Sequence, residues 1–385
     1  MKFALLNADD ATADFVEALA RAGHEVIGYY GGDATAAARI QTFAPQAKPL
    51  DAWEGVLVES GTAVIAGTAG GREERFEQLR RLALEGMPAV VIHPAGLSTL
   101  EYHEVDMNRQ AGRAPLVAYE PKRHHPLIAT AARELHASSD ESGIGPVQQI
   151  IIDRQSGRRG RDDVLREFVG DLGSAQQFVG PCQKISAMGS LTHDRSTNDL
   201  GVQVTTSDGV LIRWSIGPVL DRAGAVMTIV GGRGRCTVAM PEQGDWTIEF
   251  RIGDETARDV EQAGAASQHA AAAVVAAIEA GDESSWRGAL ADMELVDALE
   301  RSLHKGRTIE LFHEAASEEG TFKGVMAAGG CLMLMLGIAA AVAATIFGSF
   351  RLPGAGIWPY ALLALMSVFL LLQLLRFAFP PEPRK

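Results

Sequence analysis

Two long apolar segments near the C-terminal end constrain this chain more than any other feature of its sequence. Residues 325–347 contain 23 residues without a charge, and residues 357–379 contain another 23 with one charge, Arg376. A helix of this length reaches roughly 34 Å, enough to cross the hydrocarbon core of a bilayer. The nine residues between them include Pro353 and three glycines. We therefore expect a transmembrane helical hairpin at residues 325–379; the alternative is a pair of buried helices, which usually have a polar edge.

Basic residues beside these segments predict the orientation of the hairpin. Only Arg351 lies in its turn, whereas several basic residues lie at its ends: Arg301, Lys305, Arg307 and Lys323 before it, and Arg376, Arg384 and Lys385 around its exit. Lys and Arg are enriched on the cytoplasmic side of membrane proteins. The first residues of the chain lack the apolar run of a signal peptide. We expect the rest of the chain in the cytoplasm, held at the inner membrane, with the lipid bilayer as a partner.

Charge and cysteine content exclude several classes of function. The chain has 35 Lys and Arg against 48 Asp and Glu, a net charge of −13. This charge opposes binding to nucleic acid, so we expect no nucleic-acid partner. The cysteines are widely spaced, at Cys182, Cys236 and Cys331. They form neither a close-set metal motif nor an even-numbered disulfide framework, which favours a reducing compartment.

Residues 1–120 have the pattern of an α/β domain. Apolar runs at residues 1–7, 24–30, 63–66 and 89–93 alternate with helical spacing at residues 11–22 and 73–85. Apolar strands that alternate with amphipathic helices predict a parallel sheet covered on both faces. The sequence therefore predicts a Rossmann-like domain of the type that binds dinucleotides.

In such a sheet a ligand binds beyond the carboxyl ends of the strands. The expected cofactor-binding residues follow predicted strands: Asn7, Asp33, Gly67, Gly70 and Pro94. The loop after the first strand, NADDAT, lacks the glycines that let a backbone approach a pyrophosphate. Asp9 and Asp10 stand there, and we interpret them as helix N-caps; the alternative is that they place carboxylates where phosphates bind.

Residues 121–318 have a different pattern and predict a second domain. Strand-like runs begin at residues 147, 202, 210, 225, 236 and 246, and helical segments cover residues 268–280 and 286–305. Many strands gathered in one stretch of sequence indicate a mostly antiparallel sheet, so we expect an α+β domain with an open sheet face.

The order of these elements and several local stretches resemble the Gfo/Idh/MocA oxidoreductase family. The resemblance covers about residues 1–311 and rests on these stretches: DAWE at 51–54, the strand at 89–94, RHHP at 123–126, GPVQ at 145–148, TIVGGRG at 228–234, and the segment 286–311 with ELVDALERSLHKGRTIEL. It implies a Rossmann domain followed by an open-faced sheet domain, a nicotinamide cofactor, NAD or NADP, and a sugar or polyol as substrate.

The chain departs from the pattern of this family at the expected catalytic positions. The family has an E-K-P triplet where this chain has Ile92, His93 and Pro94, and an H-x-x-D pair where it has Phe168 and Asp171. We expect His93, which titrates near neutrality in water, and Asp171 as the remaining catalytic candidates. Arg123 and His124, at the junction of the domains, are the expected substrate-binding residues.

Two other groups of residues, histidines and arginines, are candidates for a metal site and an anion site. Histidines 93, 103, 124, 125 and 136 do not match a metal motif, since Met107 stands where H-E-x-x-H needs a ligand, so we predict no metal site. Arg154, Arg158, Arg159 and Arg161 are followed by acidic residues, which favours a solvated loop over an anion site.

The sequence thus leaves two functions open. One is a membrane-anchored, nicotinamide-dependent oxidoreductase with a sugar-like substrate. The other is a catalytically inactive protein on the same scaffold that serves as a sensor or assembly platform, which the missing lysine and histidine favour. We also expect a homo-oligomer formed through the open sheet face.

Overall fold

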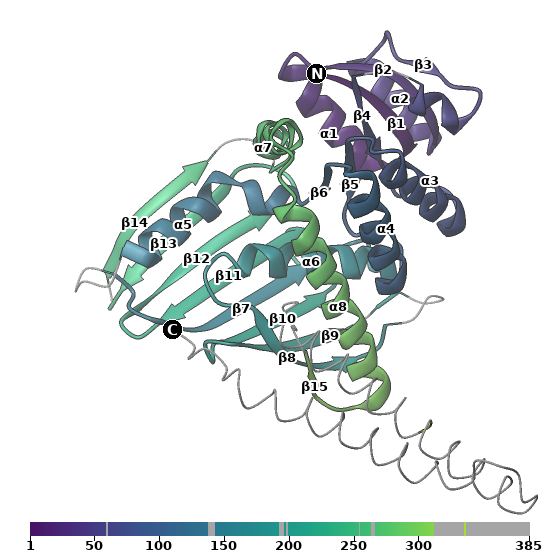
Figure 1. Cartoon of the computed structure of the whole chain (residues 1–385). Helices are drawn as coiled ribbons and strands as arrows, with labels where there is room; N and C mark the ends of the chain where they lie inside the picture. Colours follow the sequence, from purple (N-terminus) through teal and green to yellow (C-terminus); the bar gives the residue numbers. More distant parts are fainter. Residues whose placement is uncertain are drawn as a thin grey trace, which may run out of the picture. The chain divides into compact units, whose positions relative to one another are not determined.

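Six parallel strands form the first sheet, in the order β3-β2-β1-β4-β5-β6 (Figure 1). The strands are β1 (Lys2–Ala8), β2 (Glu25–Gly32), β3 (Lys48–Pro49), β4 (Thr62–Ala66), β5 (Ala89–Ile92) and β6 (Leu116–Tyr119). Between them lie α1 (Asp10–Arg21), α2 (Ala34–Phe43), the short 3-10 helix η1 (Trp53–Leu57), α3 (Arg72–Leu84) and α4 (Thr99–Gly112). Strands β4, β5 and β6 are buried at every residue, as expected for a parallel sheet with helices on both faces. The Rossmann-like prediction is confirmed.

Local capping explains where two of these helices begin. Asp9 is the N-cap of α1, and its side chain accepts a hydrogen bond from the backbone N–H of Thr12. Ser98 and Glu101 form a reciprocal capping box at the start of α4. Both satisfy N–H groups that a helix leaves unpaired in its first turn.

The second sheet has nine strands, in the order β14-β13-β12-β11-β7-β10-β9-β8-β15. They are β7 (Val147–Gln155), β8 (Cys182–Gly189), β9 (Leu200–Thr206), β10 (Leu211–Gly217), β11 (Gly224–Gly231), β12 (Gly234–Pro241), β13 (Trp246–Ile252), β14 (Glu255–Gln262) and β15 (Ile309–Glu310). β7 and β10 pair in parallel and the other neighbours pair antiparallel. The predicted open-faced sheet domain is confirmed, as a mixed sheet.

Helices cover one face of this second sheet. They are α5 (Pro126–Ala137), α6 (Arg161–Ala175) and α8 (Ser284–Lys305), and the short 3-10 helix η2 (Pro121–His124) precedes α5 (Figure 1). Strand β10, next to the central strand β7, alternates buried and less buried residues, with Trp214 and Ile216 turned to the helices. Val226 and Met188 are exposed on other strands, at 45% and 82%.

One helix after the second sheet belongs to the core of the first. Helix α7 (Ala266–Ala280) buries Ala270, Val274 and Ile278 in the same apolar cluster as Phe15 and Tyr119. The chain therefore leaves the first sheet after β6, forms most of the second sheet, and returns to cover the first.

The structure describes residues 1–58, 61–137, 143–191, 196–197, 199–253, 255–262, 266–311 and 335, and the chain divides into Met1–Phe312 and His313–Lys385. Within the described residues, no helix combines the length and apolar character needed to span a bilayer. The predicted hairpin at residues 325–379 lies, apart from Met335, outside the described residues.

Candidate functional site

The strand order of the first sheet reverses between β1 and β4, so their loops meet at its carboxyl edge. Asn7, the penultimate residue of β1, has a positive φ of 53°, and its side chain donates a 2.6 Å hydrogen bond to Gln78 of α3. Both side chains are buried. Asn7 thus fixes the first loop against α3, at the place where ligands bind in this class of sheet.

The carboxylate of Asp9 occupies the centre of this edge. One oxygen accepts hydrogen bonds from the backbone N–H and the hydroxyl of Thr12, each at 2.8 Å. The other oxygen accepts the backbone N–H of Thr68 at 3.0 Å and also the Thr68 hydroxyl. Burial raises the pKa of Asp9, but these bonds and the charge of Arg166 outweigh it, so the pKa is lowered and Asp9 is ionised near neutral pH. The N-cap interpretation is confirmed, and the carboxylate also bridges to the loop after β4.

Two glycines shape that second loop. A Cβ on Gly67 would lie 2.2 Å from the backbone oxygen of Asn7, which is too close for any other residue. Gly70 has a φ of 83°, a conformation that L side chains rarely adopt. Gly67 therefore lets the loops after β1 and β4 touch, which leaves no gap for a ligand between them at this point.

The other predicted cofactor residues lie on two different sides of this edge. Asp33 is exposed at the start of α2 and its side chain makes no capping hydrogen bond. Pro94 follows β5 and lines a polar cleft of about 520 Å³. The structure thus separates Asp33 from Pro94.

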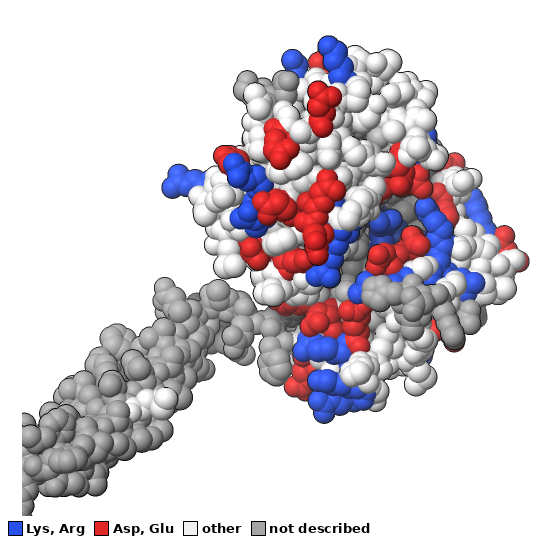
Figure 2. Space-filling model, turned by 90° about the vertical axis from the view of Figure 1, so that its right-hand side faces the viewer, with Lys and Arg blue, Asp and Glu red and all other residues white. Residues whose placement is uncertain are grey.

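This cleft lies between loops of the first sheet and helices of the second domain. Residues after β4 and β5 form one wall, and α6 and α8 form the other. Its lining contains four arginines and three acidic residues: Arg72, Arg75, Arg161, Arg166, Asp162, Asp297 and Glu300. On the side of the molecule seen in Figure 2, basic and acidic side chains lie next to one another around a hollow.

Arg75 and Arg166 are the cationic groups of the cleft with the fewest carboxylate contacts. The guanidinium of Arg75 donates to the carbonyl oxygens of Thr68, Gly70 and Ala95. Burial lowers the pKa of Arg75, although it remains a cation. Arg166 donates to the Thr68 hydroxyl at 3.1 Å, and its buried Nε has no partner among the described residues. These two side chains suit an anionic group.

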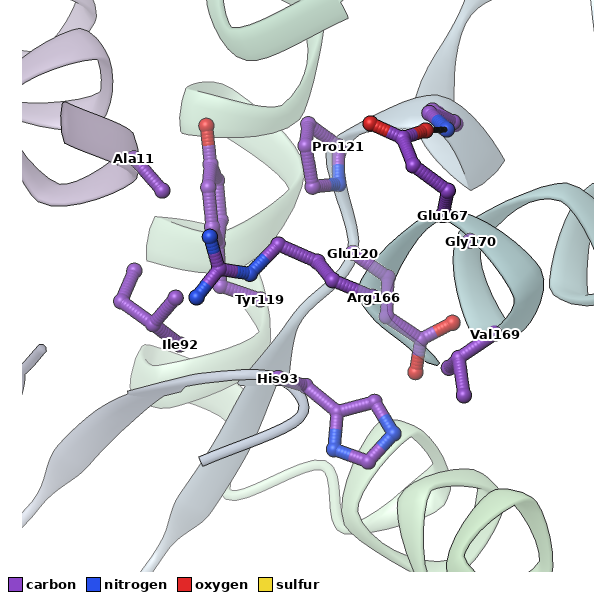
Figure 3. A pocket seen from close by; sticks show the side chains of 11 residues that line it. Ala11, Ile92, His93, Tyr119, Glu120, Pro121, Arg166, Glu167, Val169 and Gly170 are labelled. Atoms are coloured by element: carbon purple, nitrogen blue, oxygen red, sulfur yellow. Dashed lines mark hydrogen bonds and ion pairs between the residues drawn. The ribbon is translucent and has the colours of Figure 1, made fainter. Parts of the chain in front are cut away.

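His93 directly follows β5 and lines a cavity of about 110 Å³, and it is itself almost fully buried (Figure 3). Its Nδ1 lies 2.8 Å from the hydroxyl of Tyr102. Burial, with the charge of Arg123, lowers the pKa of His93 to about 3. Near neutral pH the ring is uncharged, so it differs from the lysine of the resembling family, which is a cation there.

Two carboxyl groups lie beside His93. Glu120 follows β6 and lines the same cavity, and Asp292 comes from α8 with its Oδ2 3.7 Å from Nε2 of His93. Burial raises the pKa of both carboxyl groups. Sequence reasoning missed Glu120 and Asp292, because neither belongs to a local motif. An acidic residue directly after a buried strand was the signal that could have identified Glu120.

The predicted substrate residues Arg123 and His124 lie in η2 and are half-buried. Arg123 donates from Nη1 to Glu120 at 3.2 Å. Burial lowers the pKa of His124, as does the charge of Arg123. Arg123 is therefore tied to the buried carboxyl group of Glu120, and neither residue lines the polar cleft.

Asp171 lies in a buried network of α6. It accepts hydrogen bonds from Arg154, Lys122 and the indole N–H of Trp214. Burial raises its pKa, but the charges of Arg154 and Lys122 outweigh this and lower it to about 2. Each oxygen of Asp171 thus already accepts a hydrogen bond. The sequence predicted Asp171 as a catalytic group, and the structure adds a structural role.

The expectation of a solvated arginine loop is wrong for Arg154. Arg154 lies in β7 with 3% exposure and pairs with Asp171 and Glu167. Arg161 pairs with Glu300 of α8, while Arg158 is exposed and pairs with Asp10. The sequence pattern failed here because Asp171, the acidic partner of Arg154, lies in α6 and is not close to Arg154 in the sequence.

Comparison with known proteins identifies the fold. No family profile matches the sequence. No curated protein matches it either. Among solved structures, a myo-inositol dehydrogenase from Corynebacterium glutamicum is 16% identical, with a TM-score of 0.64 over 81% of this chain and 99% of that one. KijD10, a 3-ketoreductase from Actinomadura kijaniata in complex with NADP and TDP-benzene, is 16% identical, with a TM-score of 0.66 over 79% of this chain and 98% of that one.

The chain shares their fold. A putative NADPH-dependent oxidoreductase from Desulfitobacterium hafniense gives the same result, at 13% identity and a TM-score of 0.66 over 80% of this chain and 97% of that one. These neighbours are Gfo/Idh/MocA-type oxidoreductases, so the resemblance in the sequence is confirmed at the level of the fold. In this shared fold, the polar cleft of the chain lies at the carboxyl ends of β4 and β5.

Proposed function

We propose that this chain is a nicotinamide-dependent oxidoreductase that acts on a sugar or polyol, with NAD or NADP as cofactor. The observation that carries the proposal is the cleft of about 520 Å³ at the carboxyl edge of the first sheet, closed by helices of the second domain. Ligands of doubly wound sheets bind at this edge. The solved structures that share the fold include one in complex with NADP and one in complex with NAD+ and L-tartaric acid.

The first loop does not fit a dinucleotide pyrophosphate in the way that a glycine-rich loop does. The backbone N–H groups of Thr12 and Thr68, which face the carboxyl edge, already bind Asp9. An ionised carboxylate at this position also repels a phosphate. This observation favours the second candidate function, a catalytically inactive sensor or scaffold on the same fold.

The arginine side chains of the cleft favour a ligand with an anionic group. Arg75 and Arg166 line it, and Arg166 keeps an unpaired Nε among the described residues. A guanidinium binds carboxylates and phosphates with paired hydrogen bonds. An acidic sugar, a sugar phosphate or a phosphate of the cofactor would all match this chemistry.

Direct titration of the full chain in detergent tests the proposal. The protein is purified without added cofactor, denatured, and its supernatant assayed for NAD and NADP by mass spectrometry; the folded protein is then titrated with both. We expect bound or titratable dinucleotide, with affinity at least about tenfold weaker in Arg166→Gln. Arg158→Gln, which removes an exposed arginine near the same helix, is the matched control. No dinucleotide binding at millimolar concentration would reject the oxidoreductase proposal and favour the inactive scaffold.

We further propose that residues 325–379 hold this oxidoreductase at the cytoplasmic membrane, with residues 1–312 on the cytoplasmic side. The lengths of the two apolar segments and the placement of the flanking basic residues support this location. Pairing through the open face of the second sheet is proposed for the oligomer, and the exposed Val226 on that sheet supports it.

A further inference from the structure

Three side chains converge at the ends of β5 and β6, and the proposed cofactor binding in the polar cleft uses none of them. His93, Glu120 and Asp292 each offer one ligand atom, and these atoms all lie within 4.8 Å of one another. All three residues are buried, with exposures of 6%, 5% and 2%. Figure 3 shows the side chains of His93 and Glu120 close together among the residues that line the cavity.

Each of the three has a polar atom without a partner. His93 Nε2, Glu120 Oε1 and Asp292 Oδ2 are buried and make no hydrogen bond to a described residue. An unpaired polar or charged atom inside a protein costs a few kcal/mol of stability or more, so such atoms are rare singly and rarer in groups. Three of them within reach of one another indicate that something binds between them.

The spacing matches a cation better than direct hydrogen bonds. His93 Nε2 and Asp292 Oδ2 are 3.7 Å apart, beyond hydrogen-bond distance. Ligand bonds of about 2.0–2.2 Å to a tetrahedral divalent ion place two ligand atoms roughly 3.3 Å apart. The three ligand atoms lie within 4.8 Å of one another, so metal binding requires the side chains to move together.

The surrounding groups hold two of the ligands in position. The Tyr102 hydroxyl, 2.8 Å from His93 Nδ1, can accept the Nδ1–H and leave Nε2 as a lone pair. It also accepts the backbone N–H of Ala95. Arg123 donates to the second oxygen of Glu120. Such partners orient the ligands of metal sites in proteins.

We propose that His93, Glu120 and Asp292 bind a divalent transition-metal ion of the zinc class. One imidazole and two carboxylates are a ligand set that zinc accepts, and two ionised carboxylates balance the charge of the ion. Three protein ligands leave a fourth position open, and the cavity of about 110 Å³ beside His93 and Glu120 gives it space. An ion there would polarise an oxygen atom of a bound small molecule.

The test measures metal binding by the full chain in detergent, without any assay of oxidoreductase activity. The protein is stripped with a chelator, then titrated with zinc chloride by calorimetry and with cobalt chloride by visible absorption, and metal content is measured by mass spectrometry. We expect one equivalent per chain and the visible bands of four-coordinate cobalt. His93→Gln and Asp292→Asn should each weaken zinc binding at least about 100-fold.

A second pair of the same residue types provides the control. His103 and Glu294 lie 3.6 Å apart on the exposed surface of α4 and α8. His103→Gln should leave the stoichiometry and affinity unchanged. Zinc should also raise the Tm of the wild-type chain but not that of Asp292→Asn, which keeps the shape of the side chain without its charge.

Two results would overturn the inference. If the folded wild-type chain binds neither zinc nor cobalt, the two carboxyl groups are protonated and the site is only a buried polar cluster. If His103→Gln removes the bound metal while Asp292→Asn keeps it, the ion belongs to the surface. Because the readouts are metal content and spectra, the site stands or fails independently of the cofactor titration.

Discussion

Asp9 is the residue that most distinguishes the first loop of this chain from a glycine-rich loop that binds a dinucleotide. Its carboxylate binds N–H groups from two loops, so it acts as an internal anion at the carboxyl edge of the first sheet. The sequence alone identified the residue, since it has the position and type of a helix N-cap. It did not identify Thr68 as the second donor, because that contact depends on the neighbouring positions of β1 and β4.

Replacing Asp9 with serine should strengthen dinucleotide binding by the full chain by about tenfold. Serine can still cap α1, but it removes the negative charge and frees the N–H of Thr68. The measurement is calorimetric titration with NAD and NADP. Asp10→Ser removes the same charge from an exposed position, and it should change the affinity little. Equal effects of the two substitutions would show that net charge, not the occupied donors, sets the affinity.

Gly67→Ala should destabilise the protein by about 1–3 kcal/mol. The added methyl group would lie 2.2 Å from the Asn7 oxygen and 2.6 Å from the Thr12 hydroxyl, so the two loops must separate. Urea denaturation of the full chain in detergent measures the change. Gly71→Ala, where a Cβ meets no atom within 4 Å, should leave the stability within about 0.5 kcal/mol. A neutral Gly67→Ala would mean that the loops do not pack as described.

At the scale of elements, the sequence predicted most strands and helices because their patterns are local. The strand-like runs at β10 and β11 and the helical segments at α1, α3 and α8 are confirmed. Helix α6 was missed, because four arginines directly before or at its start indicated a loop. The buried cluster of His93, Glu120 and Asp292 was also missed, since three distant segments supply it and no spacing relates them.

The ion pairs between β7 and α6 give a prediction for stability. Asp171→Asn should destabilise the protein by about 3–5 kcal/mol at neutral pH, because the buried Arg154 would lose one of its two carboxylate partners and keep only the pair with Glu167. Denaturant titration measures this value. Asp153→Asn, at an exposed hydrogen bond to Ser215 on another side of β7, is the control and should cost less than about 1 kcal/mol.

The same pair sets a response to acid. The pKa of Asp171 is lowered from 3.8 to about 2 in the folded state, so its ionised form stabilises the protein above about pH 4. This contribution, on the order of 2 kcal/mol, is lost as the pH falls from about 4 toward 2. Denaturation curves between pH 6 and pH 2.5 should therefore fall more steeply for wild type than for Asp171→Asn. Parallel curves would show that another group controls acid unfolding.

At the scale of the whole molecule, the division into Met1–Phe312 and His313–Lys385 separates the folded domains from the proposed anchor. We expect the full chain in the membrane fraction of cells, resistant to carbonate washing, because two long apolar helices hold it there. Deleting residues 313–385 should move it to the soluble fraction, with the unfolding profile of its two sheets unchanged. A full chain that remains soluble without detergent, or that carbonate releases, would contradict the anchor.

A ribosome makes β1 to β6 long before it makes α7, although α7 covers part of the apolar face that contains Phe15 and Tyr119. During synthesis this face stays uncovered while nearly all of the second sheet is produced. The N-terminal domain is therefore completed late. Until α7 is made, the growing chain exposes an apolar surface. The two domains are thus completed almost together, because α8 and β15 of the second domain directly follow α7 in the chain.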